Sequence, residues 1–290
     1  MKKLEFIKRS NGSHWVGDGF PVQNIFSYND IAKNISPFLM MDHAGPIDFP
    51  PTTQKLGVGQ HPHRGFETVT IVYHGGVSHR DSSGAGGTIG PGDVQWMTAA
   101  SGLIHEEFHS EDYARQGGPF EMIQLWVNLP AKDKMNRPGY QGITSEQIPS
   151  VALPSDAGTA RLIAGSYETG QNVTEGAART FTPMNVWDMR LMSGRTLSIE
   201  LPEGHTTALY VLRGSLNVDS QNVKKSEMAV MQNTGTTLNV EILEDAIVLL
   251  LSGEPLNEPI VGHGPFVMNT SEEISQAMRD FKDGKFGQIA

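Results

Sequence analysis

Two stretches decide the fold of this sequence: HPHRGFE, which starts at His61, and GLIHEE, which starts at Gly102. His61 and His63 are two residues apart, and His105 and Glu107 repeat that spacing. On a β-strand, residues two apart point to the same face. Two such strands can therefore place three imidazoles and one carboxylate around a single ion. The spacing predicts a metal site inside a β-barrel.

The types of ligand narrow the choice of metal. Imidazole and carboxylate together suit Fe(II), Cu, Ni, Zn or Mn better than they suit Ca or Mg. The chain has no cysteine, which excludes thiolate ligands, disulfides and a cysteine nucleophile. The residues alone leave the identity of the metal open.

Composition excludes several other classes of protein. The net charge of −10 and the pI of about 5.4 disfavour direct binding to nucleic acid, which needs a concentrated basic surface. The N-terminal residues lack the apolar segment of a signal peptide. The longest apolar run, residues 246–251, is too short to span a bilayer. We therefore expect a soluble, cytoplasmic protein with no membrane partner.

Short apolar runs separated by turns point to an all-β protein. The 32 glycines and 17 prolines supply these turns, and the runs alternate as half-buried strands do. This pattern is typical of a sandwich or a barrel. Residues 130–154 are polar and rich in proline, as expected of a connection between two β-domains. We predict domains at residues 1–145 and 146–290.

The C-terminus has a different periodicity. The run from Asn269 to Glu273 resembles a helix start, with a hydroxyl cap followed by acids in the first turn. Apolar residues then recur with helical spacing at Ile274, Ala277, Met278 and Phe281. A short amphipathic helix packed on a barrel is expected here, with partner docking as the alternative.

The motifs HPHRGFETV, PGDVQWMTA, GLIHEE, QLWVNLP and GEPLNEPIVGHGPFVMNT resemble those of the pirin family, within the cupin superfamily. The resemblance runs from about Asn24 to the C-terminus. It implies a bicupin with two stacked jelly-roll barrels, a metal in the N-terminal domain and none in the C-terminal domain. It also implies a monomer and a metal that is typically iron, although Cu, Ni, Mn, Co or Zn could take the place of Fe(II).

The resemblance also assigns the metal ligands. Position by position they are His61, His63, His105 and Glu107. Glu67 occupies the glutamate position of the general cupin motif, so we keep it as a second candidate beside the ion. Either Glu107 or Glu67 could accept a proton from a substrate hydroxyl. In the second domain only His205 remains of the corresponding motif, and one histidine cannot hold an ion.

Three functions follow from the resemblance. The first is a quercetin 2,3-dioxygenase, which takes a flavonol and O₂ and releases a ring-cleaved depside and carbon monoxide. The second is an iron-dependent, redox-sensing binding protein that regulates a transcription factor or an enzyme through protein contact. The third is an inert bicupin that keeps a metal without using it. Metal ligands reveal a site and not a reaction, so residues alone do not rank the three.

Several other polar residues lie near the motifs. His43, His74, His79 and His109 could line the cavity, but we favour polar loop histidines for each. For Arg64 we favour a salt bridge over a role in guiding anionic ligands.

Overall fold

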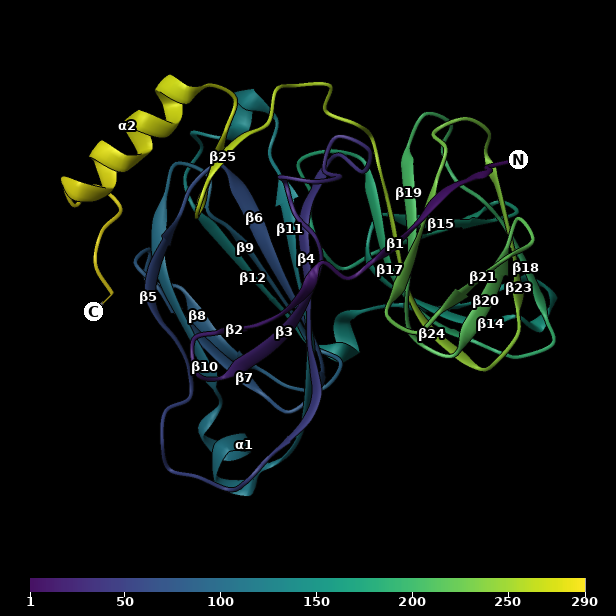
Figure 1. The fold of residues 1–290 in the computed structure, drawn as a ribbon, viewed down its shortest axis with the longest axis horizontal. Helices are drawn as coiled ribbons and strands as arrows, with labels where there is room; N and C mark the ends of the chain where they lie inside the picture. Colours follow the sequence, from purple (N-terminus) through teal and green to yellow (C-terminus); the bar gives the residue numbers. More distant parts are fainter. Residues whose placement is uncertain (290) are drawn as a thin grey trace. The chain divides into compact units, whose positions relative to one another are not determined.

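Residues 1–289 are described by a computed structural model, in which the chain forms two compact units. The first barrel, as we call the unit with the histidine motifs, contains Asn11–Lys33, Phe38–Ser145 and the residues from Asn257 on. The second barrel contains Met1–Ser10, Asn34–Pro37 and Glu146–Leu256. Each unit is built mainly of antiparallel strands (Figure 1).

Two facing sheets form the first barrel. The larger has the strand order β12-β9-β6-β11-β4-β3-β2, and the smaller has the order β5-β10-β7-β8. The strands of the larger sheet are β12 (Gly139–Ile143), β9 (Val94–Thr98), β6 (Phe66–His74), β11 (Gly118–Asn128), β4 (Phe38–Phe49), β3 (Phe20–Phe26) and β2 (Gly12–Val16). The strands of the smaller sheet are β5 (Gly57–His63), β10 (Leu103–His109), β7 (Val77–Asp81) and β8 (Gly86–Ile89).

The second barrel repeats this plan. Its larger sheet has the order β1-β22-β19-β24-β17-β14-β13, and its smaller sheet has the order β18-β23-β20-β21. The strands of the larger sheet are β1 (Leu4–Arg9), β22 (Glu227–Met231), β19 (Thr206–Arg213), β24 (Ala246–Gly253), β17 (Met184–Leu191), β14 (Gly158–Ala164) and β13 (Ser150–Ala152). The strands of the smaller sheet are β18 (Thr196–Glu200), β23 (Thr237–Ile242), β20 (Ser215–Val218) and β21 (Gln221–Lys224). A separate hairpin pairs β15 (Ser166–Thr169) with β16 (Asn172–Glu175).

Alternating apolar residues explain why these segments form strands. On β18, Leu197 and Ile199 are buried while their neighbours are exposed. On β24 nearly every residue is buried, as expected of a strand covered on both faces. The all-β bicupin expected from the sequence is confirmed. The connection predicted over residues 130–154 contains two strands, β12 and β13, and three short 3₁₀ turns that the sequence pattern did not reveal. These turns are η1 (Ala131–Asp133), η2 (Ser145–Gln147) and η3 (Pro154–Asp156).

Each end of the chain belongs to a different unit from the one that a single division after residue 145 would give it. Met1–Ser10 belongs to the second barrel because β1 pairs with β22 at the edge of its sheet. The residues after Asn257 belong to the first barrel, where the hairpin β25 (Val261–His263) and β26 (Phe266–Met268) precedes a helix. One cut between 145 and 146 therefore does not separate the two units.

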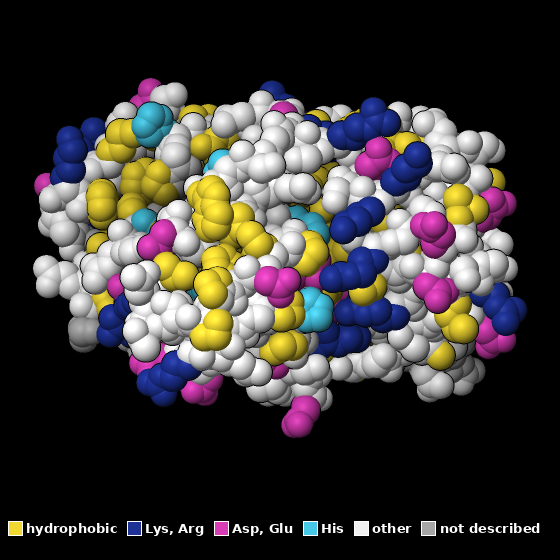
Figure 2. Space-filling view, turned by 60° about the horizontal axis from the view of Figure 1, so that its bottom comes forward, with side chains coloured by type: hydrophobic (Ala, Val, Ile, Leu, Met, Phe, Trp, Pro, Cys, Tyr) yellow, Lys and Arg dark blue, Asp and Glu magenta, His cyan; other side chains and the backbone are white. Residues whose placement is uncertain are grey.

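The C-terminal helix is present as predicted. Helix α2 (Ser271–Lys282) begins with a reciprocal capping box between Thr270 and Glu273. Ile274 and Ala277 are buried against β26 in a small apolar cluster. A second helix, α1 (Glu111–Gln116), was not predicted and is capped by Ser110. Within residues 1–289, neither helix has the length and apolar character needed to cross a membrane. Figure 2 shows basic, acidic and apolar side chains together on the face that it draws.

Candidate metal centre

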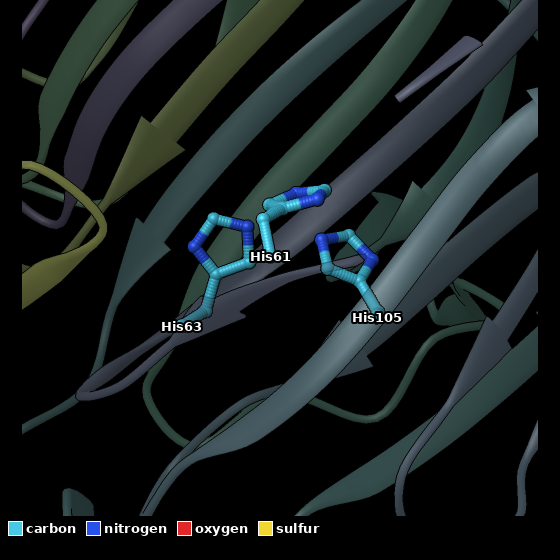
Figure 3. Close-up of side chains that lie close together, drawn as sticks. All are labelled: His61, His63 and His105. Atoms are coloured by element: carbon cyan, nitrogen blue, oxygen red, sulfur yellow. The ribbon is translucent and has the colours of Figure 1, made fainter. Parts of the chain in front are cut away.

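The pairing of β5 with β10 brings the three predicted histidines together. The strands are antiparallel, and His61 lies opposite His105 in their register. Ligand atoms from His61, His63 and His105 all lie within 4.8 Å of one another. Figure 3 shows the three rings converging, with His63 and His105 on either side of His61. This cluster of three imidazoles can hold one metal ion.

The rings are close enough to share an ion, and burial disfavours the charged form of His63 and of His105. The ring centroids of His61 and His105 are 4.1 Å apart, and those of His63 and His105 are 4.8 Å apart. Burial, with a further contribution from His61, holds the pKa of His63 and of His105 well below the usual range. A neutral imidazole keeps the lone pair that a metal needs.

Hydrogen bonding indicates which nitrogen His61 and His105 can offer. His61 Nδ1 lies 2.8 Å from the carbonyl oxygen of Gly59 and donates to it, so Nε2 is left with the lone pair. His105 Nε2 is buried and has no hydrogen-bond partner within residues 1–289. A buried polar atom without a partner is costly unless something else fills that role. A metal ion fits this requirement.

Glu107 lies two residues after His105 on β10, opposite His79 of β7. It is buried, and its Oε1 accepts hydrogen bonds from Gln95 Nε2 at 3.3 Å and Thr70 Oγ1 at 3.4 Å. Its ligand atom groups with those of His79 and His105, again within 4.8 Å of one another. The structure thus gathers the three histidines in one group and Glu107 in a second group, with His105 common to both.

His79 was expected to be a polar loop histidine, and that prediction is wrong. It lies on β7, is 1% exposed, and pairs in register with Glu107. Its Nε2 is 3.2 Å from Asp81 Oδ2, and its Nδ1 is 3.2 Å from His105 Nδ1. Tyr140 on β12 stacks on the His79 ring, with the two ring centroids 5.2 Å apart. His79, Asp81 and Tyr140 therefore surround the predicted site.

Glu67 does not lie beside the histidines, contrary to the expectation from the cupin motif. It pairs in register with Thr98, three positions from the pair of Thr70 and Gln95. Positions three apart on a strand face opposite ways. Thr70 faces Glu107, so Glu67 lies on the other face of β6, where it accepts a hydrogen bond from Thr98 Oγ1 at 2.7 Å. Burial raises the pKa of Glu67 to about 7.

An aromatic wall stands on one side of the three histidines. Phe66 stacks on Trp126 with their centroids 4.2 Å apart, and both rings contact His63, at 5.2 Å and 5.3 Å. Phe66 is fully buried, whereas Trp126 and His61 are half-buried. The wall therefore combines a rigid apolar surface with partial access from outside, which suits a flat organic molecule.

The turn that follows His63 is held by residues far away in the sequence. Gly65 has φ +94°, and a side chain there would collide with the Val267 backbone. The buried Lys134 donates to the Gly65 and Val267 carbonyl oxygens and to Asn128 Oδ1. Burial lowers the pKa of Lys134 to about 7. Sequence reasoning missed Lys134 because it lies within the polar connection.

Arg64 and Glu106 point away from the cluster. Arg64 forms a buried ion pair with Asp280, at 2.8 Å, so the favoured salt bridge is confirmed. Glu106 faces outward, where Arg80 and Lys55 bind it. A surface hollow of about 630 Å³ lies on this outer face of β7 and β10, and it is separate from the histidine cluster.

The other nearby histidines divide between core and surface. His43 is buried on β4 and lies 3.0 Å from Glu121, and His109 is buried among Phe20, Phe49 and Phe120. The favoured prediction of polar loop histidines is wrong for these two, because both lie on strands. His74, at the end of β6, has a side chain 48% exposed.

The second barrel has a hollow of about 720 Å³, lined in part by His205, Trp187 and Tyr167. In the part of the chain that the structure describes, both groups with three metal-ligating side chains lie in the first barrel. A second barrel without metal stays a prediction.

Comparisons with known proteins agree with this architecture. The family model described as "Pirin" matches residues 19–127, and "Pirin C-terminal cupin domain" matches residues 186–287. A protein of Pseudomonas aeruginosa named "Putative quercetin 2,3-dioxygenase" is 56% identical over 286 residues, 99% of each chain. Human "Pirin" is 37% identical over 264 residues, 88% of this chain and 84% of that protein. A crystal structure of quercetin 2,3-dioxygenase from Acinetobacter baumannii is 51% identical, with a TM-score of 0.94 and complete coverage of both chains.

Proposed function

The chain belongs to the pirin family, and we propose that it is a metal-dependent dioxygenase that cleaves a flavonol such as quercetin at the 2,3 position. The observation that carries this proposal is the convergence of three imidazoles beside an aromatic wall in the first barrel. The names of the Pseudomonas and Acinetobacter proteins support the choice of substrate class.

We assign His61, His63, His105 and Glu107 as the metal ligands, with Fe(II) as the metal and Cu, Ni, Mn, Co or Zn as alternatives. The three rings approach one another directly, and Glu107 adjoins His105 on the same strand face. Both hydrogen bonds from Gln95 and Thr70 reach Oε1, so they do not engage Oε2. The bound metal would supply Lewis acidity toward a substrate oxygen.

The side chains around the ion would position the substrate. Phe66 and Trp126 offer a flat apolar surface beside His63, on which a flavonol ring can stack. Glu107 would accept the proton of the substrate hydroxyl, since its carboxylate lies in one group of ligand atoms with His105. We do not assign this role to Glu67, which lies on the opposite face of β6.

The test is metal content and quercetin turnover measured together. The protein is purified without oxygen and loaded separately with Fe(II), Cu(II), Ni(II), Mn(II), Co(II) or Zn(II). Turnover that follows one metal, releases carbon monoxide and vanishes in His63→Ala is the expected result. His74→Ala is the matched control, because His74 is half exposed and lies outside the cluster. One metal per chain with no turnover of quercetin would contradict the dioxygenase.

The second candidate is a metal-dependent regulator that acts through protein contact. The observation in its favour is the 37% identity with human Pirin, a protein whose name states no enzymatic activity. A protein partner that binds the metal-loaded chain, and not His63→Ala, would support this function. Binding that is equal for the two proteins would contradict it.

A further inference from the structure

A chain of three buried side chains runs behind the metal site. Strands β7 and β10 are antiparallel neighbours, with Asp81 opposite His105 and His79 opposite Glu107. Asp81 Oδ2 is 3.2 Å from His79 Nε2, and His79 Nδ1 is 3.2 Å from His105 Nδ1. Asp81 and His79 are 3% and 1% exposed, and His105 is fully buried. Water therefore has little access to these contacts.

The donor at each contact follows from the chemistry of Asp81. Its Oδ1 accepts from the backbone N–H groups of Ser83 and Ala85 and from the Ser83 hydroxyl, as an ionised carboxylate does. An ionised carboxylate cannot donate, so the proton in the contact with His79 is on His79 Nε2. With this one N–H on Nε2, His79 Nδ1 has a lone pair and accepts.

The same reasoning fixes the proton on His105. Because His79 Nδ1 accepts, His105 Nδ1 must donate across the 3.2 Å contact. His105 Nε2 then carries a lone pair and no proton. This is the atom that is buried without a hydrogen-bond partner within residues 1–289. Two independent observations, the direction of the hydrogen bonds and the partnerless atom, thus agree on one tautomer.

We propose that Asp81 and His79 are positioning residues that hold His105 in the Nδ1–H tautomer and present its Nε2 to the metal ion. This inference rests on the metal site of the proposed function, and it does not depend on the substrate. Carboxylates or carbonyls that bind the second nitrogen of a ligating histidine commonly set its orientation and basicity. Here a second histidine is placed between the carboxylate and the ligand.

His61 shows the same device in a simpler form. Its Nδ1 donates to the backbone carbonyl of Gly59, so its Nε2 is also left as the ligand. A backbone acceptor cannot be removed by substitution, whereas Asp81 and His79 can. The chain of side chains is therefore the part of the site where tautomer control can be tested directly.

The decisive variant is Asp81→Asn. It should reverse the donor and acceptor roles in the hydrogen bonds from residue 81 through His79 to His105. The amide oxygen of asparagine can still accept from the Ser83 and Ala85 backbone, so its NH₂ group takes the place of Oδ2. That group donates to His79 Nε2, which moves the His79 proton to Nδ1. His105 Nδ1 then becomes an acceptor, and its proton moves to Nε2, the atom needed by the metal. We expect binding of Zn(II) or Fe(II) to weaken about 10- to 100-fold.

Two measurements are made on the full-length chain. Long-range ¹⁵N–¹H NMR correlations of histidine report the tautomer of His105 before and after Zn(II) is added. Competition with a coloured chelator gives the metal affinity. The expected result is Nδ1–H in the starting protein and Nε2–H in Asp81→Asn before metal is added, with weaker binding in the variant. Asp81→Glu is expected to restore the tautomer and part of the affinity.

Asp93→Asn is the matched control. Asp93 also accepts backbone N–H groups in turns, those of Gly90 and Ser145, and no histidine contact is involved. We expect Asp93→Asn to leave the tautomer and the affinity unchanged. A starting protein with His105 as Nε2–H overturns the proposal without any variant, even if Asp81→Asn fails to fold. Unchanged affinity in a folded Asp81→Asn overturns it as well. Failure to turn over quercetin with metal bound would contradict only the dioxygenase.

Discussion

Arg64 Nη1 lies 2.8 Å from Asp280 Oδ2, in a buried ion pair that joins helix α2 to the residue after His63. Asp280 also binds Lys285, and bonds from Lys285 and Arg64 hold the pKa of its carboxyl far below the usual range. The guanidinium further donates from Nε to the Ser101 carbonyl oxygen and lies over the Phe286 ring. Several links at one arginine thus connect the C-terminal segment to the strand that carries the histidines.

Removing one partner of this pair should be costly. Asp280→Ala leaves the Arg64 charge buried without its carboxylate, and breaking a buried pair in this way typically costs about 3–5 kcal/mol. We expect the free energy of unfolding, measured with urea, to fall by about 3 kcal/mol. Asp283→Ala is the control, since the Asp283 side chain is 62% exposed, and a change below about 0.5 kcal/mol is expected there. Equal effects of the two substitutions would contradict the importance of the pair.

Neighbouring glutamates on β10 offer a matched test of the site. Glu107 faces the histidines, whereas Glu106 faces outward to Arg80 and Lys55. Glu107→Gln removes the negative charge of a proposed ligand while keeping the shape of the side chain. We expect it to weaken metal binding at least 10-fold and to abolish quercetin turnover. Glu106→Gln should leave metal content unchanged, so a loss of metal in both variants would point to a general effect on β10.

Glu67 should make stability depend on pH. Its folded pKa of about 7 is above the value of 4.5 that the group would have when unfolded, because burial disfavours the charge. The folded state therefore binds the proton more tightly than the unfolded state does, which stabilises the folded state. This stabilisation is fully present below pH 4.5 and is lost as pH rises through about 7. The shift corresponds to about 3 kcal/mol.

Glu67→Gln removes this titration. We expect the variant to be more stable than the starting protein above pH 7, by up to about 3 kcal/mol, and to differ less at pH 5. Thermal unfolding of the metal-free chains across pH 5–8 measures the effect. Glu168→Gln, at an exposed position of β15, should show the pH profile of the starting protein. A parallel pH profile for Glu67→Gln would mean that Glu67 is ionised throughout.

The buried histidines should bind metal without first losing protons. Burial holds the pKa of His63 and of His105 well below 6.5, so both rings stay neutral at pH 6 in the metal-free chain. The contribution of these rings to metal affinity should therefore change little between pH 8 and pH 6. Proton release on binding Zn(II), measured by calorimetry in two buffers, tests this. Release of two or more protons per ion at pH 6 would contradict it.

Local spacing predicted the part of the site that lies within single strands. The i, i+2 pairs at His61 and at His105 each define one face of a strand, and the structure brings the three histidines together. The alternation of residues along β6 also indicates on which face Glu67 lies. It places Thr68 and Thr70 on one face and Glu67 on the other, which argues against Glu67 as a ligand despite its place in the motif.

The surroundings of the site could not be predicted in the same way. His79, Asp81 and Tyr140 come from β7 and β12, whose pairing partners are set by long-range packing rather than by local pattern. The segment around Tyr140 has two glycines and little alternation, so β12 was not expected to be a strand. The proposed metal ligands could therefore be identified in the sequence, whereas the residues proposed to orient them could not.

The way the chain ends are shared between the units has a practical consequence for dissection of the protein. A fragment that stops at residue 145 would lack β25, β26 and α2, so Arg64 and Lys134 would lose Asp280 and Val267 as partners. A fragment that starts at residue 146 would lack β1 and leave the edge of β22 open, which is a template for aggregation. Neither half is a self-sufficient expression unit, and a divided protein would need each tail grafted back onto its own barrel.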